Sequence, residues 1–215
     1  MNDLIIILLV AIYIAIVYTI PIVLYKKNRI NKRTARMIIH FFSGLSIISL
    51  FFATNKWLYF IASAVITLIV FLSRKSTPFL KHIFHSMNDE QEKNYLQGPV
   101  LYGVSITYLI LFSIVTNNTI IPLMSTLILI ISDPLAAIVG KNYGKNIFSI
   151  LGNNRTFEGS LAMLISNLII ISSFFGFSMK ALAISFIISI VELISPSKID
   201  DFTLPFSASL LLINY

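Results

Sequence analysis

The sequence LILIISDPLAAIVGKNYGKN, from Leu127 to Asn146, begins as a continuous apolar run and then places Asp133 beside Pro134. An ionisable side chain at membrane depth is costly and is by default a candidate for function. The proline removes a backbone donor from the helix and leaves a carbonyl free. Irregular backbone at this depth is tolerated where it lines a cavity or binds a ligand. The stretch therefore predicts a membrane span that is broken at a functional site.

The composition of the whole chain agrees with a membrane environment. Of its 215 residues, 57% are hydrophobic and 12% are charged, and the mean hydropathy is +0.88. Soluble domains average roughly 45–50% apolar and about 25% charged residues. We therefore expect an all-α, polytopic helical bundle of seven to eight transmembrane helices that forms a single catalytic domain over residues 1–215. The apolar runs cover residues 4–24, 38–53, 57–72, 100–115, 120–139, 161–177, 179–194 and 202–213.

Two features narrow the chemistry and the class of this chain. It has no cysteine, which excludes disulfides, thiolate metal sites and a cysteine nucleophile. The first apolar run lacks a basic start and a small-residue cleavage site, so we expect a retained span and not a signal peptide. So compact a chain favours the plasma membrane of a prokaryote.

The basic residues predict the orientation, because short loops rich in Lys and Arg stay cytoplasmic. If the first loop is inside, only Lys56 and Lys180 of the sixteen basic residues fall outside. The inner ones are Lys26, Lys27, Arg29, Lys32, Arg33, Arg36, Arg74, Lys75, Lys81, Lys93, Lys141, Lys145, Arg155 and Lys198. We therefore expect the N-terminus outside and the active face in the cytoplasm. The net charge of +7 suits anionic lipid or an anionic ligand. Nucleic acid is a poor partner, since there is no basic soluble domain to hold it.

The acidic residues gather on the same inner side. Asp133 lies seven residues before Gly140, which is about 10 Å from the inner end of its span at 1.5 Å per residue. Four connections bring acids to one depth, and these acids are Asp133, Glu158, Glu192, Asp200 and Asp201. Glu158 follows Thr156 and also has the pattern of a first-turn acid that stabilises a helix N-terminus.

Cations and glycines accompany these acids, namely Lys141, Lys145, Arg155, Gly140, Gly144, Gly152 and Gly159. Mg²⁺ prefers one or two carboxylates together with phosphate oxygens and water, while cations and backbone N–H groups hold the remaining phosphate charge. The pattern thus predicts a metal and phosphate site at the inner surface. Packing of small residues between helices is the alternative reading of Gly140 and Gly144.

The same stretches resemble a known family. SDPLAAIVGKNYGKN, NRTFEGSLA and IDDFTLPF match, in order and spacing, the blocks of the polyprenol kinase family, and RMIIH and GPVLY are similar to its N-terminal segments. This family includes dolichol kinases and phytol kinases, integral membrane enzymes that phosphorylate a lipid alcohol with CTP or a related nucleotide. The resemblance implies functional positions at Asp133, Gly140, Gly144, Glu158, Gly159, Ser160 and Asp200. Ser132 and Asp201 depart from the usual glycine and asparagine, and Arg155 stands where a lysine is common.

A mechanism follows as a hypothesis. The resemblance implies that CTP brings Mg²⁺ to some of Asp133, Glu158 and Asp200, and one of these carboxylates, for which we choose Asp133, takes the proton of the lipid hydroxyl. The candidate nucleotide-binding residues are Gly140, Lys141, Gly144, Lys145, Arg155, Thr156, Gly159 and Ser160. Further candidates are Arg36, His40, Glu192 and Asp201, with His40 either a helix-end histidine or a substrate-site residue.

Two other classes stay open. A cytidylyltransferase that forms a CDP-lipid would use the same nucleotide, metal and membrane, but would release pyrophosphate. A small secondary transporter would also explain an acid beside a proline break, but would predict comparable polar residues on both faces. The predicted outer connections are short and nearly featureless, which favours the lipid alcohol kinase.

Overall fold

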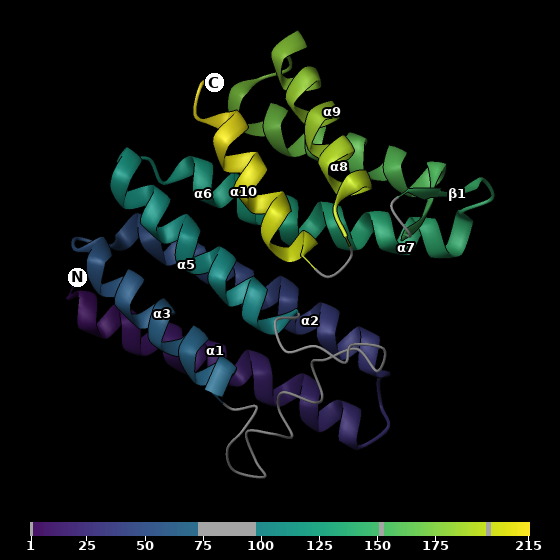
Figure 1. The fold of residues 1–215 in the computed structure, drawn as a ribbon. Helices are drawn as coiled ribbons and strands as arrows, with labels where there is room; N and C mark the ends of the chain where they lie inside the picture. The colour runs from purple at the N-terminus through teal and green to yellow at the C-terminus, as the bar shows by residue number, and fades with distance from the viewer. Residues whose placement is uncertain (1, 73–97, 151–152, 197–198) are drawn as a thin grey trace. The chain divides into compact units, whose positions relative to one another are not determined.

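The computed structural model describes residues 2–72, 98–150, 153–196 and 199–215. In these residues the chain is helical except for one two-stranded antiparallel hairpin (Figure 1). The elements of the first half are α1 (Asp3–Lys26), α2 (Lys32–Gly44), the 3₁₀-helix η1 (Leu45–Phe52), α3 (Lys56–Leu72) and α5 (Pro99–Thr116). The second half has α6 (Ile120–Leu127), the π-helical η2 (Ile128–Ser132), α7 (Asp133–Tyr143), β1 (Ile147–Ile150), β2 (Asn153–Thr156), α8 (Phe157–Phe175), α9 (Met179–Ile194) and α10 (Asp200–Leu212).

Each predicted apolar run corresponds to a helix, which confirms the helical, multi-pass class. Five helical segments among the described residues are long and apolar enough to cross a membrane: Asp3–Lys26, Lys32–Phe52, Pro99–Thr116, Ile120–Tyr143 and Phe157–Phe175. Lys56–Leu72 is a shorter apolar helix. The total of seven to eight crossings and the orientation stay predictions. Five of the basic residues assigned to the inner side, Arg74, Lys75, Lys81, Lys93 and Lys198, lie outside the described residues.

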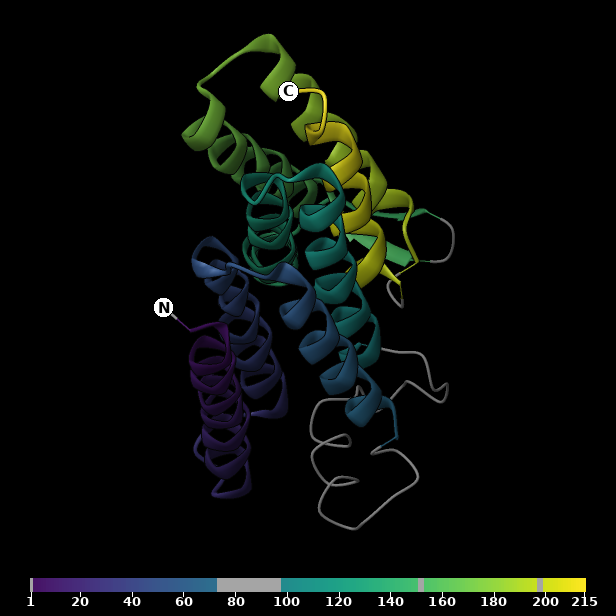
Figure 2. The ribbon, with the colours of Figure 1, turned by 90° about the vertical axis from the view of Figure 1, so that its left-hand side faces the viewer.

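Helix packing divides the chain into two compact units, Met1–Thr119 and Ile120–Tyr215, and each is described by itself. In the N-terminal unit α1 packs on α2 and α3 packs on α5, and each pair lies side by side in two views (Figures 1 and 2). The Asp3 carboxylate accepts hydrogen bonds from the backbone N–H groups of Thr54 (2.9 Å) and Asn55 (2.7 Å). This contact joins the start of α1 to the start of α3.

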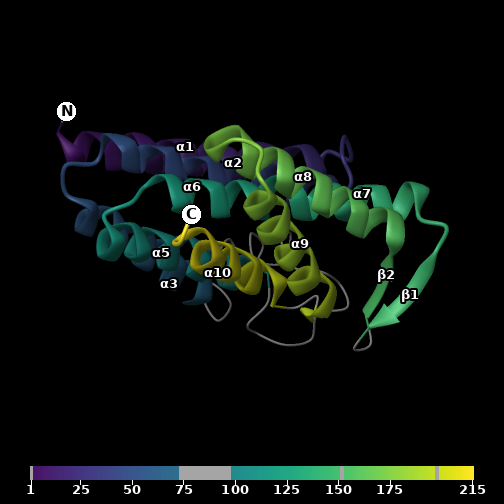
Figure 3. The same cartoon turned by 90° about the horizontal axis from the view of Figure 1, so that it is seen from above.

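In the C-terminal unit α8 packs against α7 and α9, and α10 packs against α9 and α6. Asn167 of α8 is fully buried and donates to the hydroxyl of Ser189 on α9 over 3.4 Å. The β1–β2 hairpin connects α7 to α8 and pairs Phe148 with Arg155 (Figure 3). The hairpin lies between the apolar runs predicted at residues 120–139 and 161–177, where no strand was predicted.

Candidate functional site

The predicted break at Asp133 and Pro134 takes the form of a π-helical turn. The backbone N–H of Asp133 donates to the carbonyl of Ile128, five residues earlier, at the point where η2 passes into α7. Pro134 occupies the first turn of α7, where its missing N–H is tolerated best. Short π-helical segments inside α-helices occur often at functional sites. The helix is thus distorted at the predicted position, but it is not broken and continues from Ile120 to Tyr143. The functional role of this position stays a prediction.

Arg155 connects three elements of the C-terminal unit. From β2, its Nη1 atom lies 3.0 Å from Oε1 of Glu192 on α9, and its Nη2 atom donates to the Glu192 carbonyl at 3.3 Å. Nη2 also lies 3.9 Å from Oδ2 of Asp200 at the start of α10. The side chain of Glu192 is only 5% exposed, so its charge depends on Arg155 for compensation.

More carboxylates surround this ion pair than Arg155 can neutralise. Burial, together with the nearby charges of Asp133 and Asp201, raises the pKa of Asp200 to about 8, although Arg155 opposes this shift. Asp200 precedes the apolar run of α10. We call Asp133, Arg155, Glu192, Asp200 and Asp201 the acid–arginine cluster. Such an excess of negative charge favours a bound cation. Glu192 and Asp201, predicted as further candidates, are thus placed beside Asp133 and Asp200.

Glu158 has a different environment at the start of α8. Its Oε1 atom accepts a hydrogen bond from Nδ2 of Asn146 at 3.3 Å, and the backbone N–H groups of Lys145 and Asn146 also donate to its carboxylate. Thr156 caps the same helix by accepting from the N–H of Gly159 at 3.1 Å. The alternative reading of Glu158 as a first-turn acid is therefore confirmed. Its Oε2 atom is nevertheless buried with no hydrogen-bond partner among the described residues.

The glycines serve helix packing between α7 and α8. A Cβ atom on Gly159 would lie 2.9 Å from the carbonyl oxygen of Ala136, and one on Gly140 would lie 2.8 Å from Oγ1 of Thr156. A Cβ on Gly144 would lie 2.5 Å from Cγ2 of Thr156. The space beside these glycines is therefore filled by protein atoms. This close packing favours the packing alternative for Gly140 and Gly144, and a contact of these glycines with phosphate stays a prediction.

The remaining candidates occupy three kinds of position. Lys141 and Lys145 are exposed at the end of α7 and just after it. The Ser160 hydroxyl donates to the Thr156 carbonyl at 3.1 Å, within the first turn of α8. In the N-terminal unit, the carbonyl of His40 accepts from the hydroxyl of Tyr102 at 2.9 Å, and the two rings lie 4.3 Å apart. That unit also holds Arg36, whose guanidinium packs against Gly98.

Two residues that the sequence indicated, Ser132 and Arg155, also have unpaired polar atoms, which could not be predicted. The hydroxyl of Ser132, in the last residue of η2, and Nε of Arg155 are buried and have no hydrogen-bond partner within the described ranges. Buried polar atoms are normally paired, so unpaired ones indicate a place for a ligand, an ion or water. Among the described residues, no three Asp, Glu, His or Cys side chains form a group that would hold a metal ion by themselves.

The fold and this site define a multi-pass helical membrane protein with an acid–arginine cluster at a π-helical turn. The chain is 25% identical over 196 residues to a phytol kinase of Synechocystis sp. (strain ATCC 27184 / PCC 6803 / Kazusa), covering 86% of this chain and 81% of that protein. This similarity confirms the resemblance to the polyprenol and phytol kinases that the motifs indicated. No family model and no solved structure matches the chain.

Proposed function

We propose that this protein phosphorylates a long-chain isoprenoid alcohol of the phytol, polyprenol or dolichol type, using CTP and Mg²⁺ and releasing CDP. The observation that carries the proposal is the acid–arginine cluster at the π-helical turn, where the buried Nε of Arg155 has no hydrogen-bond partner among the described residues. The similarity to a phytol kinase supports the choice of substrate class. We further propose that the site faces the cytoplasm, in the plasma membrane of a prokaryote.

The cluster has the groups that phosphoryl transfer requires. The reaction depends mainly on positioning and on electrostatic stabilisation of phosphate oxygens. Glu192 fixes the guanidinium of Arg155 through a 3.0 Å ion pair, and Nε, which has no partner among the described residues, would donate to a phosphate oxygen. Lys141 and Lys145 are exposed near the hairpin and would neutralise the outer phosphates of the nucleotide.

A divalent cation fits the surplus of carboxylates. Asp133 and Asp200, whose charges act on one another, would hold it. Mg²⁺ usually takes one or two protein carboxylates and completes its shell with phosphate and water, so a group of three ligating side chains is not required. When bound, the metal would neutralise charge on the transferred phosphoryl group.

Asp133 is the proposed acceptor of the proton from the lipid hydroxyl. It lies where the apolar η2 passes into α7, so an alcohol whose chain stays among apolar side chains would reach it with its polar end. A carboxylate in this position would act as the general base of the transfer. Asp133 also lies beside Asp200 and could hold the cation. One of these two acids would then act as the general base, and the other would bind the cation.

The experiment is a product analysis with the purified protein. CTP, ATP, UTP and GTP are each offered with phytol, geranylgeraniol, a polyprenol and diacylglycerol, and lipid phosphate, CDP and pyrophosphate are measured. We expect CDP and an isoprenyl phosphate in equal amounts. Release of pyrophosphate would instead support the cytidylyltransferase, and no turnover of any nucleotide would refute the proposal. Arg155→Ala should raise the KM for CTP, whereas Lys180→Ala, beyond the cluster on α9, should not change it.

A further inference from the structure

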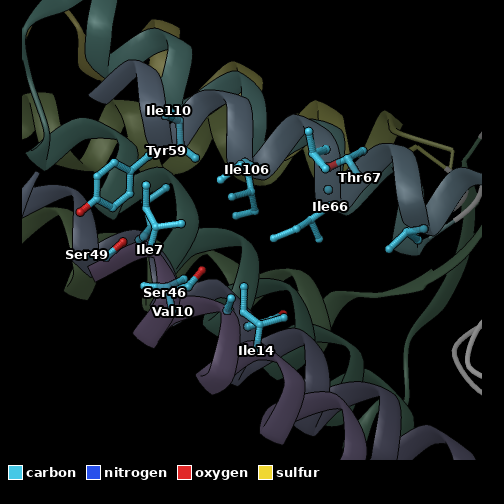
Figure 4. Close-up of a pocket in the computed structure, with 18 of the residues that line it drawn as sticks. Ile7, Val10, Ile14, Ser46, Ser49, Tyr59, Ile66, Thr67, Ile106 and Ile110 are labelled. Carbon is cyan, nitrogen blue, oxygen red and sulfur yellow. The ribbon is translucent and has the colours of Figure 1, made fainter. Parts of the chain in front are cut away.

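The N-terminal unit contains a cavity of about 300 Å³ between α1, η1, α3 and α5 (Figure 4). Its volume falls at the lower end of the range for small-molecule sites, roughly 300–1,000 Å³. Its walls are mostly branched apolar side chains, and Ile14, Ile66 and Ile106 lie around its middle. The cavity therefore suits an apolar ligand.

The cavity is long and narrow, because each of three helices lines it over several turns. The lining residues extend from Ile7 to Tyr18 on α1, from Tyr59 to Val70 on α3 and from Pro99 to Ile110 on α5. Each of these stretches is about 16 Å long at 1.5 Å per residue. A cavity of this shape accommodates an extended chain better than a compact ring system.

Hydroxyl groups lie at both ends of the cavity, and those of Tyr59 and Ser49 line one of them. Asp3 joins the start of α1 to the start of α3, so Ile7 and Tyr59 lie at one end, and Tyr18 and Val70 lie at the other. Pro99 lies at this second end, since the opposite end of α5 approaches the start of α3 through Lys56, whose Nζ donates to Ser113 at 3.0 Å.

The second end also has hydroxyl groups and a cation. Ser43 lines the cavity there and donates to the hydroxyl of Tyr102 at 3.2 Å, and Tyr102 donates onward to the His40 carbonyl. The Arg36 guanidinium packs against Gly98, the residue before Pro99. Polar groups therefore lie at both ends of the cavity, and the stretch between them is mostly apolar.

We propose that this cavity binds the isoprenoid chain of the lipid alcohol; the identity of the ligand rests on the proposed function. An acyl chain of a membrane phospholipid has the same apolar chemistry and is the other source of such a ligand. We choose the isoprenoid alcohol because the cavity is elongated and lined by branched apolar side chains, and because this chain is similar to a phytol kinase.

Photolabelling tests the cavity directly. The protein in nanodiscs is irradiated with a twenty-carbon isoprenoid alcohol that has a diazirine on its chain, and labelled residues are mapped by mass spectrometry. We expect labels on the cavity-lining positions of α1, α3 and α5, and we expect added phytol to compete while added phosphatidylglycerol does not. Equal competition by the phospholipid would overturn the assignment, and so would labelling confined to other segments.

A matched pair of variants on α3 sharpens the test. Ala62 lines the cavity and Ala64 does not, so Ala62→Phe should fill part of it while Ala64→Phe should leave it open. Loss of room for two methylene groups weakens binding by about tenfold, and we expect labelling of Ala62→Phe to fall accordingly. Unchanged labelling of Ala62→Phe would contradict the proposal. Failure of nucleotide turnover would refute the kinase assignment alone, since labelling is measured without a nucleotide.

Discussion

Replacement of Arg155 should destabilise the C-terminal unit mainly through the charge that it leaves behind on Glu192. In Arg155→Ala, the carboxylate of Glu192, only 5% exposed, loses a partner at 3.0 Å, and its backbone carbonyl loses a donor at 3.3 Å. Breaking a buried pair from one side costs about 3–5 kcal/mol. Because the Arg155 side chain is 20% exposed, water offsets part of this loss, and we expect about 3 kcal/mol.

The double variant Arg155→Ala with Glu192→Gln separates this cause from general damage. Glutamine keeps the shape of Glu192 and removes its charge, so the double variant should be more stable than the sum of the two single effects by about 1–3 kcal/mol. The free energy of unfolding is measured by SDS titration in mixed micelles. Lys145→Ala, an exposed cation on the same segment, should cost less than about 0.5 kcal/mol. Additive effects of the two cluster substitutions would refute the reasoning.

Three further predictions concern other parts of the structure. Gly159→Ala should lower the free energy of unfolding by about 1–3 kcal/mol, because the added Cβ would lie 2.9 Å from the Ala136 carbonyl oxygen. Thermal unfolding measures this effect, with Ala162→Val on the same helix as the control. Asp3→Ala should lower the Tm more than Asp3→Asn, which keeps one acceptor for the N–H groups of Thr54 and Asn55; equal Tm values would contradict this role. EDTA should abolish lipid phosphate formation and Mg²⁺ should restore it, and turnover that persists in EDTA would remove the metal from the mechanism.

The membrane helices could be predicted from the sequence because hydropathy is a local property. The apolar runs predicted at residues 57–72 and 179–194 begin and end within one residue of α3 and α9. Asp133 and Pro134 could also be interpreted, because a proline beside an acid changes the backbone wherever it occurs. The outcome was a π-helical turn, whose type depends on neighbouring helices and not on those two residues alone.

The partners within the site could not be predicted in the same way. Arg155 and Glu192 are separated by 37 residues and meet only because α8 and α9 pack together. The roles of Gly140 and Gly159 depend on how closely α7 approaches α8, which the spacing of glycines does not determine. The β1–β2 hairpin was missed because IFSI and NNRT are only four residues each, and the second lacks an alternating apolar pattern.

The central claim is that Asp133 takes part in phosphoryl transfer to a lipid alcohol. The direct measurement is the rate at which purified Asp133→Asn converts CTP and phytol to CDP and phytyl phosphate, relative to the unmodified protein. Removal of a general base lowers turnover by about 10²–10⁴-fold, so we expect Asp133→Asn to lose at least about 10²-fold. Its elution in size-exclusion chromatography and its unfolding transition should match those of the unmodified protein. Asp3→Asn, the same change in the N-terminal unit, should keep its turnover. Normal turnover in Asp133→Asn would contradict the account.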